Sequence, residues 1–421
     1  MVNTIKVPRQ ETFSETKKIF ENIHSRELSS EPERKIRVLV VITQLAMGGA
    51  TNVALDLASY FNKHPDFDVQ LITGPASEDR NDVTHLAFEY GIKTRVLPSL
   101  INEINPIANL RAITDIRKII LEENFDIVHT HTKVAGVVGR LAARSTGSCV
   151  IIHHVHGWGS PEGMSMATRM LHVSLEWLCG QFSDRIIVVS KPDINKGRDY
   201  HIGGEDKLML IYNGIDLEKF RQPVDEMMMR SKLGLETDSK LVGMIGRLED
   251  QKNPLDFIRA AAHVSERYSR VQFLMVGGGP LQLECEQLID ECDLTGKFFL
   301  LGFRDDVDKI LSILTMTAMS SLWEGLPIAF LESMSAGKPI VANDVDGASD
   351  VVKDGETGFL VPPHQPSEMA ERILTLLNDE ELCEKMGELA RQRSSFYSKQ
   401  RMLENVETLY KDLYSTSQVL I

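Results

Sequence analysis

Short apolar runs alternate with helical segments along almost the whole of this chain. The first run, RVLVVIT from Arg37, is a continuous β-branched stretch of the kind found in strands that are covered on both faces. A glycine-containing turn follows it, and then a segment, NVALDLASYF, whose apolar residues recur at helical spacing. Further strand-like runs follow before about residue 215: DVQLIT, DIVHTHT, VIIHHVH and DRIIVVS. This alternation predicts a parallel sheet with right-handed crossovers.

A second series of the same kind begins after the polar stretch RQPVDEMMMRSKLGLETDSK. Its strand-like segments are KLVGMIGRL, VQFLMVGGG, KFFLLGF, TAMSS and PIVAND. A chain of 421 residues also exceeds what one hydrophobic core usually supports. We therefore predict an α/β fold in which two Rossmann-like, doubly wound domains face each other across a cleft, with the active site at the strand ends that meet there.

Changes in composition divide the chain into four predicted units. The C-terminal unit holds a helix with Met402, Leu403 and Val406 on one face, which we expect to pack back on the first domain. The predicted units are an N-terminal extension (residues 1–33), a first domain that binds the acceptor (34–218), a second domain that binds the donor (219–395) and the C-terminal helix (396–421).

Charge and cysteine content narrow the classes of partner. The chain has 60 acidic and 46 basic side chains, a net charge of -14. Such a charge repels nucleic acid and an anionic bilayer unless a local basic patch offsets it, so we expect no nucleic-acid partner. The five cysteines are scattered and odd in number, which fits reduced thiols in a cytoplasmic setting.

The sequence predicts no membrane span. The first twenty residues hold no apolar run of signal-peptide length, and no segment approaches roughly 18 uninterrupted apolar residues. Residues 164–178 place Met and Leu at helical spacing beside Arg169, so peripheral contact at the inner face of a membrane is an alternative to packing against the core.

Two glycine-rich loops follow predicted strands. In the first, Gly48 and Gly49 precede a helix, so bare backbone amides can approach a phosphate there. The loop lacks the full dinucleotide-binding spacing and the P-loop lysine, which disfavours ordinary NAD binding and ATP hydrolysis. The second loop, from Gly277, opens the backbone in the same way. Each loop could also be a simple tight turn.

Two cations follow the strand LVGMI. Arg247 and Lys252 emerge from its C-terminal end into the predicted crevice, where they can neutralise a diphosphate. That pairing suits a leaving group that gains negative charge as a glycosidic bond breaks. Solvated surface charges are the alternative interpretation.

Two carboxylates, Glu324 and Glu332, stand eight positions apart around a predicted helix start at Pro327. Helix N-terminal amides from Gly325 and Leu326 onward would point at an anionic or polyhydroxylated ligand. We expect the two glutamate side chains to lie at different depths along one helix, about 12 Å apart, which exceeds the carboxylate separation of either class of glycoside hydrolase.

Five of the twelve histidines fall between His129 and His156, each near the end of an apolar strand. No cysteine or carboxylate completes a recognisable zinc set with them, so we predict no metal site. For His156 we expect a hydrogen-bonding role at the crevice.

At these residues the chain resembles glycosyltransferase family 4, whose bacterial members build surface polysaccharides. The resemblance runs from about Arg37 to Leu413 and lies in the combination of the GGA loop, HG, SDRIIVVS, YNGID, GRL with a lysine five residues after the arginine, GGGP, LGFRDDV and the paired glutamates. It implies a GT-B architecture and retaining transfer from a nucleotide sugar, generally without an essential metal.

The resemblance also implies roles for individual residues. These are donor-phosphate contact by Gly49, pyrophosphate contact by Arg247 and Lys252, donor-sugar contact by Glu324, ribose contact by Glu332, base recognition by the backbone of Arg304, and contact of His156 with the transferred sugar.

We therefore expect a retaining glycosyltransferase that moves a hexose or N-acetylhexosamine from a UDP-sugar to a glycan or lipid-linked acceptor, with the UDP-sugar as co-substrate and no cofactor. A nucleotide-sugar epimerase of the same fold and a donor-binding protein without turnover are the alternatives. Incubation with UDP-GlcNAc alone would separate an epimerase from a transferase.

Overall fold

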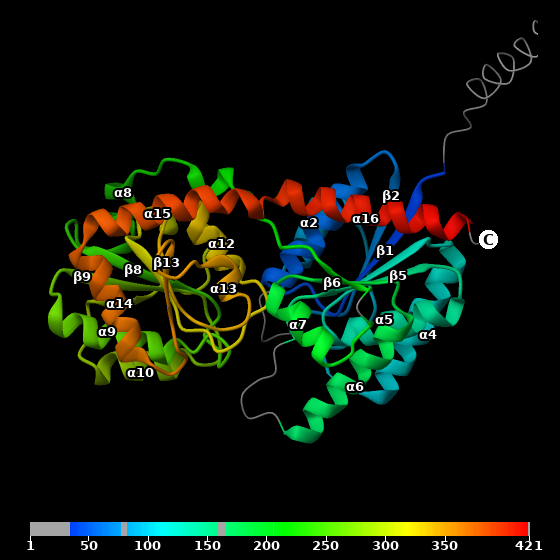
Figure 1. The fold of residues 1–421 in the computed structure, drawn as a ribbon, viewed down its shortest axis with the longest axis horizontal. Coiled ribbons are helices and arrows are strands. Elements are labelled where there is room, and N and C mark those ends of the chain that lie inside the picture. Colours follow the sequence, from blue (N-terminus) through cyan, green and yellow to red (C-terminus); the bar gives the residue numbers. More distant parts are fainter. Residues whose placement is uncertain (1–33, 77–81, 104, 159–164, 205, 420–421) are drawn as a thin grey trace, which may run out of the picture.

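The computed structural model describes residues 34–76, 82–103, 105–158, 165–204 and 206–419. The predicted N-terminal extension, residues 1–33, lies outside the described residues. The described chain forms two parallel sheets, each flanked by helices, and the two stand next to each other in Figure 1. We call the first sheet with its helices the first lobe, and the second sheet with its helices the second lobe. The predicted fold of two Rossmann-like units is confirmed.

The first lobe is built on seven strands in the order β3-β2-β1-β4-β5-β6-β7. Alternate residues of β1 face two separate apolar clusters. Val38 and Val40 pack with side chains of α2, whereas Leu39 and Val41 pack with side chains of α4 and α5. The β-branched run is buried on both faces because helices cover both. The strands are β1 (Ile36–Ile42), β2 (Phe67–Thr73), β3 (Lys93–Val96), β4 (Ile127–His131), β5 (Val150–Val155), β6 (Arg185–Val188) and β7 (Leu208–Leu210).

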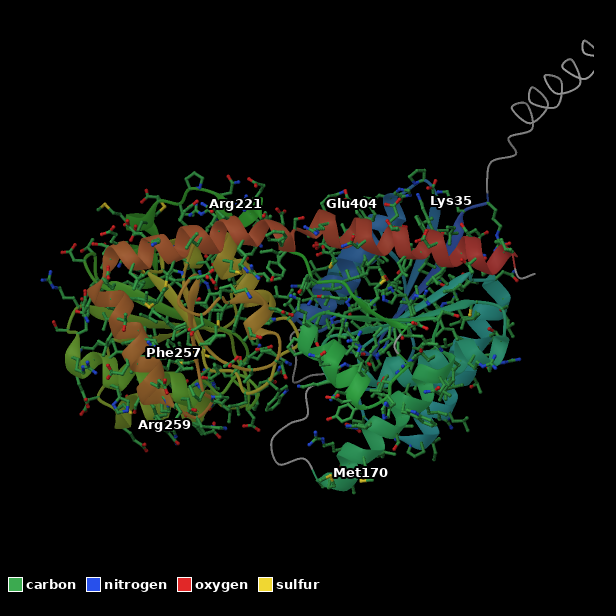
Figure 2. All side chains as sticks on the ribbon, in the orientation of Figure 1. Lys35, Met170, Arg221, Phe257, Arg259 and Glu404 are labelled. Atoms are coloured by element: carbon green, nitrogen blue, oxygen red, sulfur yellow. The ribbon has the colours of Figure 1, made fainter. Side chains whose placement is uncertain are left out.

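Parallel strands need a crossover connection between them, and in the first lobe helices form these crossovers. They are α2 (Gly49–Lys63), α3 (Thr84–Glu89), α4 (Pro106–Glu123), α5 (Lys133–Thr146), α6 (Met166–Phe182) and α7 (Lys191–Asp199). Helix α6 has 17 residues, of which only Cys179 and Gly180 are buried. Figure 2 shows Met170 at its outer end, where the helix projects from the lobe.

The second lobe has six parallel strands in the order β10-β9-β8-β11-β12-β13, around one large apolar core. The strands are β8 (Lys240–Ile245), β9 (Val271–Val276), β10 (Phe298–Leu300), β11 (Met316–Met319), β12 (Ile340–Asn343) and β13 (Gly358–Val361). The helices are α8 (Glu226–Leu233), α9 (Pro254–Arg267), α10 (Gln282–Glu291), α11 (Val307–Ile313), α12 (Ile328–Ser335), α13 (Ala348–Val351), α14 (Pro366–Asn378) and α15 (Glu380–Ser394).

The chain crosses between the lobes twice, and the two crossings are hydrogen-bonded to each other. Ile215 N donates to Tyr397 O over 3.0 Å, and Lys399 N donates to Ile215 O over 2.8 Å. Short 3-10 helices, Glu218–Arg221 and Ser395–Tyr397, flank the crossings in the chain. The connection between the lobes is therefore a paired strap.

The final helix, α16 (Lys399–Val419), lies along the first lobe, as predicted (Figure 1). Its residues Met402, Leu403, Val406 and Leu409 are buried in the same cluster as β1 and α2. Within the described residues, none of the helices combines the length and the apolar character needed to cross a bilayer.

Shortening Leu403 tests how much this docked helix stabilises the first lobe. Leu403 is 5% exposed, so Leu403→Ala leaves a cavity and should lower the free energy of unfolding by about 2–5 kcal/mol. Urea unfolding followed by circular dichroism measures this. The exposed neighbour Asn405→Ala serves as the control, and equal losses in the two variants would contradict the packing described above.

Candidate active site

The two lobes meet where a glycine of one lies against a glycine of the other. Gly157 follows β5, and a methyl group added to it would lie 2.9 Å from the Gly325 Cα. A methyl group on Gly325 would lie 2.2 Å from the His156 carbonyl oxygen. Gly157 also has φ +124°, which disfavours any other residue. The contact brings the backbone of His156 against Gly325, the residue that follows Glu324.

Lys252 and Glu324 form an ion pair at this contact. Lys252 Nζ binds Glu324 Oε1, and both side chains are mostly buried. The two residues are 72 positions apart in the sequence, yet the C-terminal ends of β8 and β11 bring them together. The carboxylate of Glu324 therefore neutralises the ammonium group of Lys252.

Arg247 points to a larger cavity between the lobes. This interlobe cavity has a volume of about 890 Å³ and is lined by Gln44 and Met47 from the first lobe and by Arg247, Gly278 and Phe303 from the second. The guanidinium of Arg247 is paired with Glu249 Oε1 at 2.7 Å, and its side chain remains 37% exposed. A ligand in the cavity can therefore reach Arg247 from the solvent side.

The predicted glycine loops lie on the same edge. A methyl group on Gly277 would lie 2.0 Å from the Gly246 carbonyl oxygen, so the loops after β8 and β9 pack backbone against backbone. Gly49 begins α2, and a methyl group there would lie 3.0 Å from Ile328 at the start of α12. The N-cap of α2 is Gly48, which has no side chain to accept a hydrogen bond. Backbone amides of the first turn of α2 therefore remain available to a ligand.

The prediction that Glu324 and Glu332 share one helix is wrong. Helix α12 begins at Ile328 with Pro327 as its N-cap, so Glu324, Gly325 and Leu326 lie in the loop before it. Proline pushes the residue before it toward extended conformations, which stops the helix from extending back to Glu324. The helical rise therefore does not give the separation of the two carboxylates.

Glu332 is half-buried on α12, and burial raises the pKa of its carboxyl to about 7. Asp308 raises this pKa further, and Lys219 lowers it. A carboxyl with such a pKa changes its charge near neutral pH.

Arg304 forms a bidentate ion pair with Asp306. Its Nε and Nη2 atoms donate to the two carboxylate oxygens of Asp306 over 2.8 and 2.6 Å. Arg304 and Lys232 together lower the pKa of Asp306 to about 2. The side chain of Arg304 is thus engaged by Asp306, and recognition of the base by the Arg304 backbone stays a prediction.

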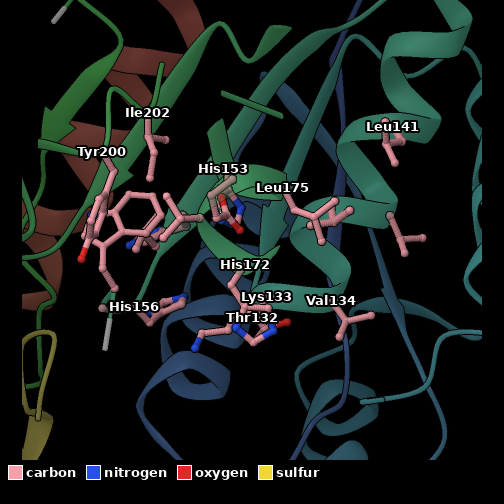
Figure 3. Close-up of a pocket in the computed structure, with 18 of the residues that line it drawn as sticks. Thr132, Lys133, Val134, Leu141, His153, His156, His172, Leu175, Tyr200 and Ile202 are labelled. Atoms are coloured by element: carbon pink, nitrogen blue, oxygen red, sulfur yellow. The ribbon is translucent and has the colours of Figure 1, made fainter. Parts of the chain in front are cut away.

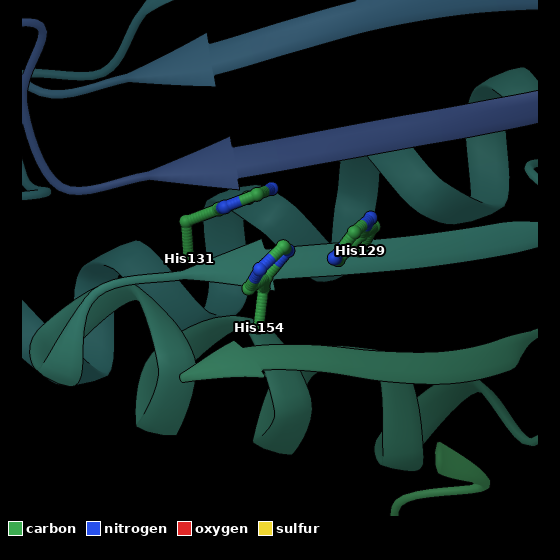
Figure 4. A group of neighbouring side chains, drawn as sticks. All are labelled: His129, His131 and His154. Carbon is green, nitrogen blue, oxygen red and sulfur yellow. The ribbon is translucent and has the colours of Figure 1, made fainter. Parts of the chain in front are cut away.

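Four histidines form a stack on one face of the first sheet. His129, His131 and His154 are fully buried and lie with His156 on neighbouring strand ends, and Figure 4 shows the first three from β4 and β5. His131 Nδ1 and His156 Nε2 share a hydrogen bond of 3.0 Å, and the Tyr410 hydroxyl is hydrogen-bonded to His129 Nδ1 over 2.5 Å. Burial lowers the pKa of His156 to about 4, so its ring is neutral at physiological pH.

Among the described residues, the same stack is where nitrogen ligands for a metal gather. One ring nitrogen from each of His129, His131 and His154 lies within 4.8 Å of the others. The sequence offers no cysteine or carboxylate to complete a zinc set, whereas the fold groups three histidine nitrogens that could serve as ligands. That the enzyme needs no metal stays a prediction.

Sequence reasoning also missed polar residues that join the lobes. Lys196 on α7 is paired with Asp346, which follows β12. Asn213 Nδ2 donates to the Leu326 carbonyl over 3.4 Å. Asn213 stood in the YNGID stretch that carries the family resemblance, whereas Lys196 and Asp346 have no sequence signal because their contact is formed only by the fold.

A second cavity lies wholly within the first lobe, which we call the first-lobe cavity. Its volume is about 490 Å³ and its lining includes His156, Gly157 and residues of α5 and α6. Figure 3 shows labelled side chains around it, among them Lys133, Leu175 and Tyr200. Sequence analysis did not predict this cavity, since its walls come from segments that are distant in the chain.

Two protein-family models match the two lobes in turn. The model for Glycosyltransferase Family 4 matches residues 47–219, and the model for Glycosyl transferases group 1 matches residues 225–393. Together they span most of the chain, and they meet between the two sheets. The chain is a GT-B glycosyltransferase. The predicted family and enzyme class are thus confirmed.

Two relatives of this glycosyltransferase are named a transferase and a synthase. It is 29% identical over 355 residues to the UDP-Gal:alpha-D-GlcNAc-diphosphoundecaprenol alpha-1,3-galactosyltransferase of Escherichia coli, covering 83% of this chain and 89% of that protein. It is 26% identical to the N-acetyl-alpha-D-glucosaminyl L-malate synthase of Bacillus anthracis, covering 73% of this chain and 80% of that protein.

Solved structures share the fold of the glycosyltransferase at lower identity. Anabaena Alr3699/HepE in complex with UDP-glucose has a TM-score of 0.76 and 23% identity, covering 89% of this chain and all of that one. Sucrose-phosphate synthase from Thermosynechococcus elongatus has a TM-score of 0.78 and 20% identity, covering 91% of this chain and all of that one.

Replacing Gly157 tests the contact between the lobes. Gly157→Ala introduces a methyl group against Gly325 and should lower sugar transfer on the order of 100-fold by displacing Glu324 from His156. Gly147→Ala is a matched control because Gly147 also has positive φ, +67°, but has no atom within 4 Å of the added methyl group. Both variants should keep a folded circular dichroism spectrum, and equal activity in the two would contradict the prediction.

The raised pKa of Glu332 predicts a pH dependence of nucleotide binding. Ribose hydroxyls donate to a carboxylate more strongly than to a neutral carboxyl group, so UDP affinity should rise as Glu332 ionises through pH 7. At pH 6 only about a tenth of the groups are ionised, so UDP should bind about tenfold more weakly than at pH 8. Calorimetry measures the Kd for UDP of the wild type and of Glu332→Gln at both pH values. Because protonation of UDP itself affects both proteins equally, the variant serves as the control. The same change of Kd with pH in both proteins would show that Glu332 does not cause it.

Proposed function

We propose that this glycosyltransferase moves a hexose or N-acetylhexosamine from a UDP-sugar to a glycan or lipid-linked acceptor, with retention of the anomeric configuration. The observation that carries the proposal is the position of the Lys252–Glu324 pair, beside the Gly157–Gly325 contact and at the same sheet edge as Arg247. Cations for a diphosphate and a carboxylate for a sugar therefore meet where the two lobes close on each other.

Arg247 and Lys252 stabilise the departing diphosphate in this proposal. The bond between the anomeric carbon and the β-phosphate oxygen breaks, and that oxygen keeps the electron pair. Its new charge is met by the fork of Arg247 and the ammonium of Lys252. Both cations are already paired, with Glu249 and Glu324, so the diphosphate competes with carboxylates for them.

The acceptor hydroxyl attacks the anomeric carbon from the face that the diphosphate leaves, and its proton passes to a departing phosphate oxygen. No nucleophile from the enzyme is required. His156 is neutral and close to Glu324-Gly325, so it can bond a hydroxyl of the transferred sugar without adding charge to the site. Approach of the two lobes excludes water, which would otherwise compete as the acceptor.

The names of the relatives support the donor and the acceptor class. The Escherichia coli relative is named for UDP-Gal and for an acceptor carried on diphosphoundecaprenol, and the Anabaena structure holds UDP-glucose. By this likeness we propose a UDP-sugar donor and a role in bacterial surface polysaccharide or glycoconjugate synthesis, on the cytoplasmic side of the membrane. The relatives named above are transferases or synthases, which favours transfer over the epimerase alternative.

Removing the charge of Arg247 tests the proposed role in leaving-group stabilisation. Arg247→Ala should lower kcat roughly 100-fold to 1000-fold, and Lys252→Ala should have a similar effect. Arg247→Lys keeps the charge and should recover part of the loss. Release of UDP from a UDP-sugar in the presence of acceptor measures the rate.

Arg259→Ala is the matched control, because Arg259 is paired with Asp256 on α9 and lies outside the proposed site. Melting temperatures show whether each variant is folded. Near-normal turnover by folded Arg247→Ala and Lys252→Ala variants would discard the assignment of both cations.

A further inference from the structure

The ring nitrogens of the histidine stack differ in what they contact. His129 Nδ1 is hydrogen-bonded to the Tyr410 hydroxyl over 2.5 Å, and His131 Nδ1 to His156 Nε2 over 3.0 Å. The Nε2 atoms of His129 and His131 and both ring nitrogens of His154 are buried and have no hydrogen-bond partner among the described residues. Each buried polar atom without a partner costs about 1–3 kcal/mol, so a ligand that met several of them at once would be stabilised there.

This distribution of contacts is typical of histidines that bind a metal. A ligating histidine gives one ring nitrogen to the metal and donates the N–H of its other nitrogen to a polar neighbour, which fixes the tautomer and the orientation of the ring. His129 and His131 each have such a neighbour at Nδ1 and an unpaired Nε2. His154 can offer either nitrogen.

The three rings come from neighbouring strands of the first sheet. His131 on β4 and His154 on β5 are register partners, and His129 precedes His131 by two residues on the same face of β4. One ring nitrogen of each lies within 4.8 Å of the others, and Figure 4 shows the three side chains together. Because these residues stand on paired strands, the backbone holds the three rings near one another without a ligand.

Burial also decides the charge of these rings. It lowers the pKa of His129, His131 and His154 well below the ordinary value, and the neighbouring rings lower it further. The rings are therefore neutral at physiological pH, and each keeps a lone pair on one nitrogen. A set of neutral imidazole nitrogens suits Zn²⁺, whereas Mg²⁺ and Ca²⁺ prefer oxygen ligands.

Binding requires the rings to turn. They are nearly parallel, with interplanar angles of 29° between His129 and His131 and 4° between His129 and His154. Zinc lies about 2.0–2.1 Å from each histidine nitrogen in tetrahedral sites, which places the nitrogens about 3.3 Å apart. Rotation about χ2 brings the nitrogens together, and this torsion has a broad distribution in histidine.

We propose that His129, His131 and His154 form a binding site for a Zn²⁺ ion. The ligands are the Nε2 atoms of His129 and His131 and one ring nitrogen of His154. Tyr410 accepts the N–H of His129, so the ion links α16 to the sheet of the first lobe. The site is structural and has no part in the proposed transfer step, in which the second lobe supplies the cations that meet the diphosphate.

Zinc binding by the full chain, after a chelator has removed bound metal, tests the inference. Zinc chloride should raise the melting temperature, whereas magnesium chloride should not. Competition with a coloured chelator should show one tightly bound zinc per chain. His154→Leu should lose this tight binding, and Tyr410→Phe, which keeps all three ligands, should weaken the Kd about tenfold or more.

The stability of His154→Leu without zinc separates a metal ligand from a residue that only packs. In EDTA this variant should melt at the same temperature as the wild type or higher, because leucine replaces two unpaired buried nitrogens with apolar atoms of similar volume. With zinc, only the wild type should gain stability. A residue needed for packing alone would instead lower the melting temperature equally in both conditions.

His85→Leu is the matched control, because His85 is an exposed histidine on α3. It should bind zinc as the wild type does, which distinguishes the stack from weak binding to surface histidines. The inference is overturned if zinc raises the melting temperature of the wild type no more than magnesium does, or if His154→Leu keeps the tightly bound zinc.

Discussion

The close approach of two backbones at Gly157 and Gly325 is the constraint on which the rest of the site depends. Side chains on either residue would hold the lobes apart, since the added atoms would lie within 3 Å of the opposite backbone. Only with the lobes this close does His156, at the end of β5, come beside Glu324, which the second lobe supplies. The paired crossings at Ile215 and Lys399 tether the lobes near this contact, where Asn213 also donates to the Leu326 carbonyl.

The electrostatics of the cleft follow from the same closeness. Arg247 and Lys252 are each paired with a glutamate, so the charges of these side chains are balanced within the protein. In the proposed mechanism, the leaving diphosphate gains a further charge as the glycosidic bond breaks, and it then competes more strongly for both cations. Pairing of the cations with glutamates would thus favour interaction in the transition state over interaction in the ground state, which is the condition for lowering the barrier.

Sequence reasoning succeeded where the signal was local. The β-branched run of β1 predicts a strand that is covered on both faces, as the structure shows. Arg247 follows the strand LVGMI directly in the sequence, so its position at the C-terminal end of a parallel strand, beside a cavity, could also be predicted. The expectation that Glu324 lies on the same helix as Glu332 failed because it extended the helical pattern after Pro327 backward past that proline. The Lys196–Asp346 pair and the first-lobe cavity escaped because each joins residues that are distant in the chain, and no periodicity reports on such contacts.

Net charge illustrates the same limit of sequence reasoning, because the charge of the whole chain does not give the charge at one site. A charge of -14 argues against anionic partners when it is spread evenly, but the Debye length of about 8 Å at physiological salt makes local charge decisive. Lys133 and Arg169 both line the first-lobe cavity, where Glu176 is the one acidic side chain of the described lining, so the local charge there does not follow from the net charge of the whole chain.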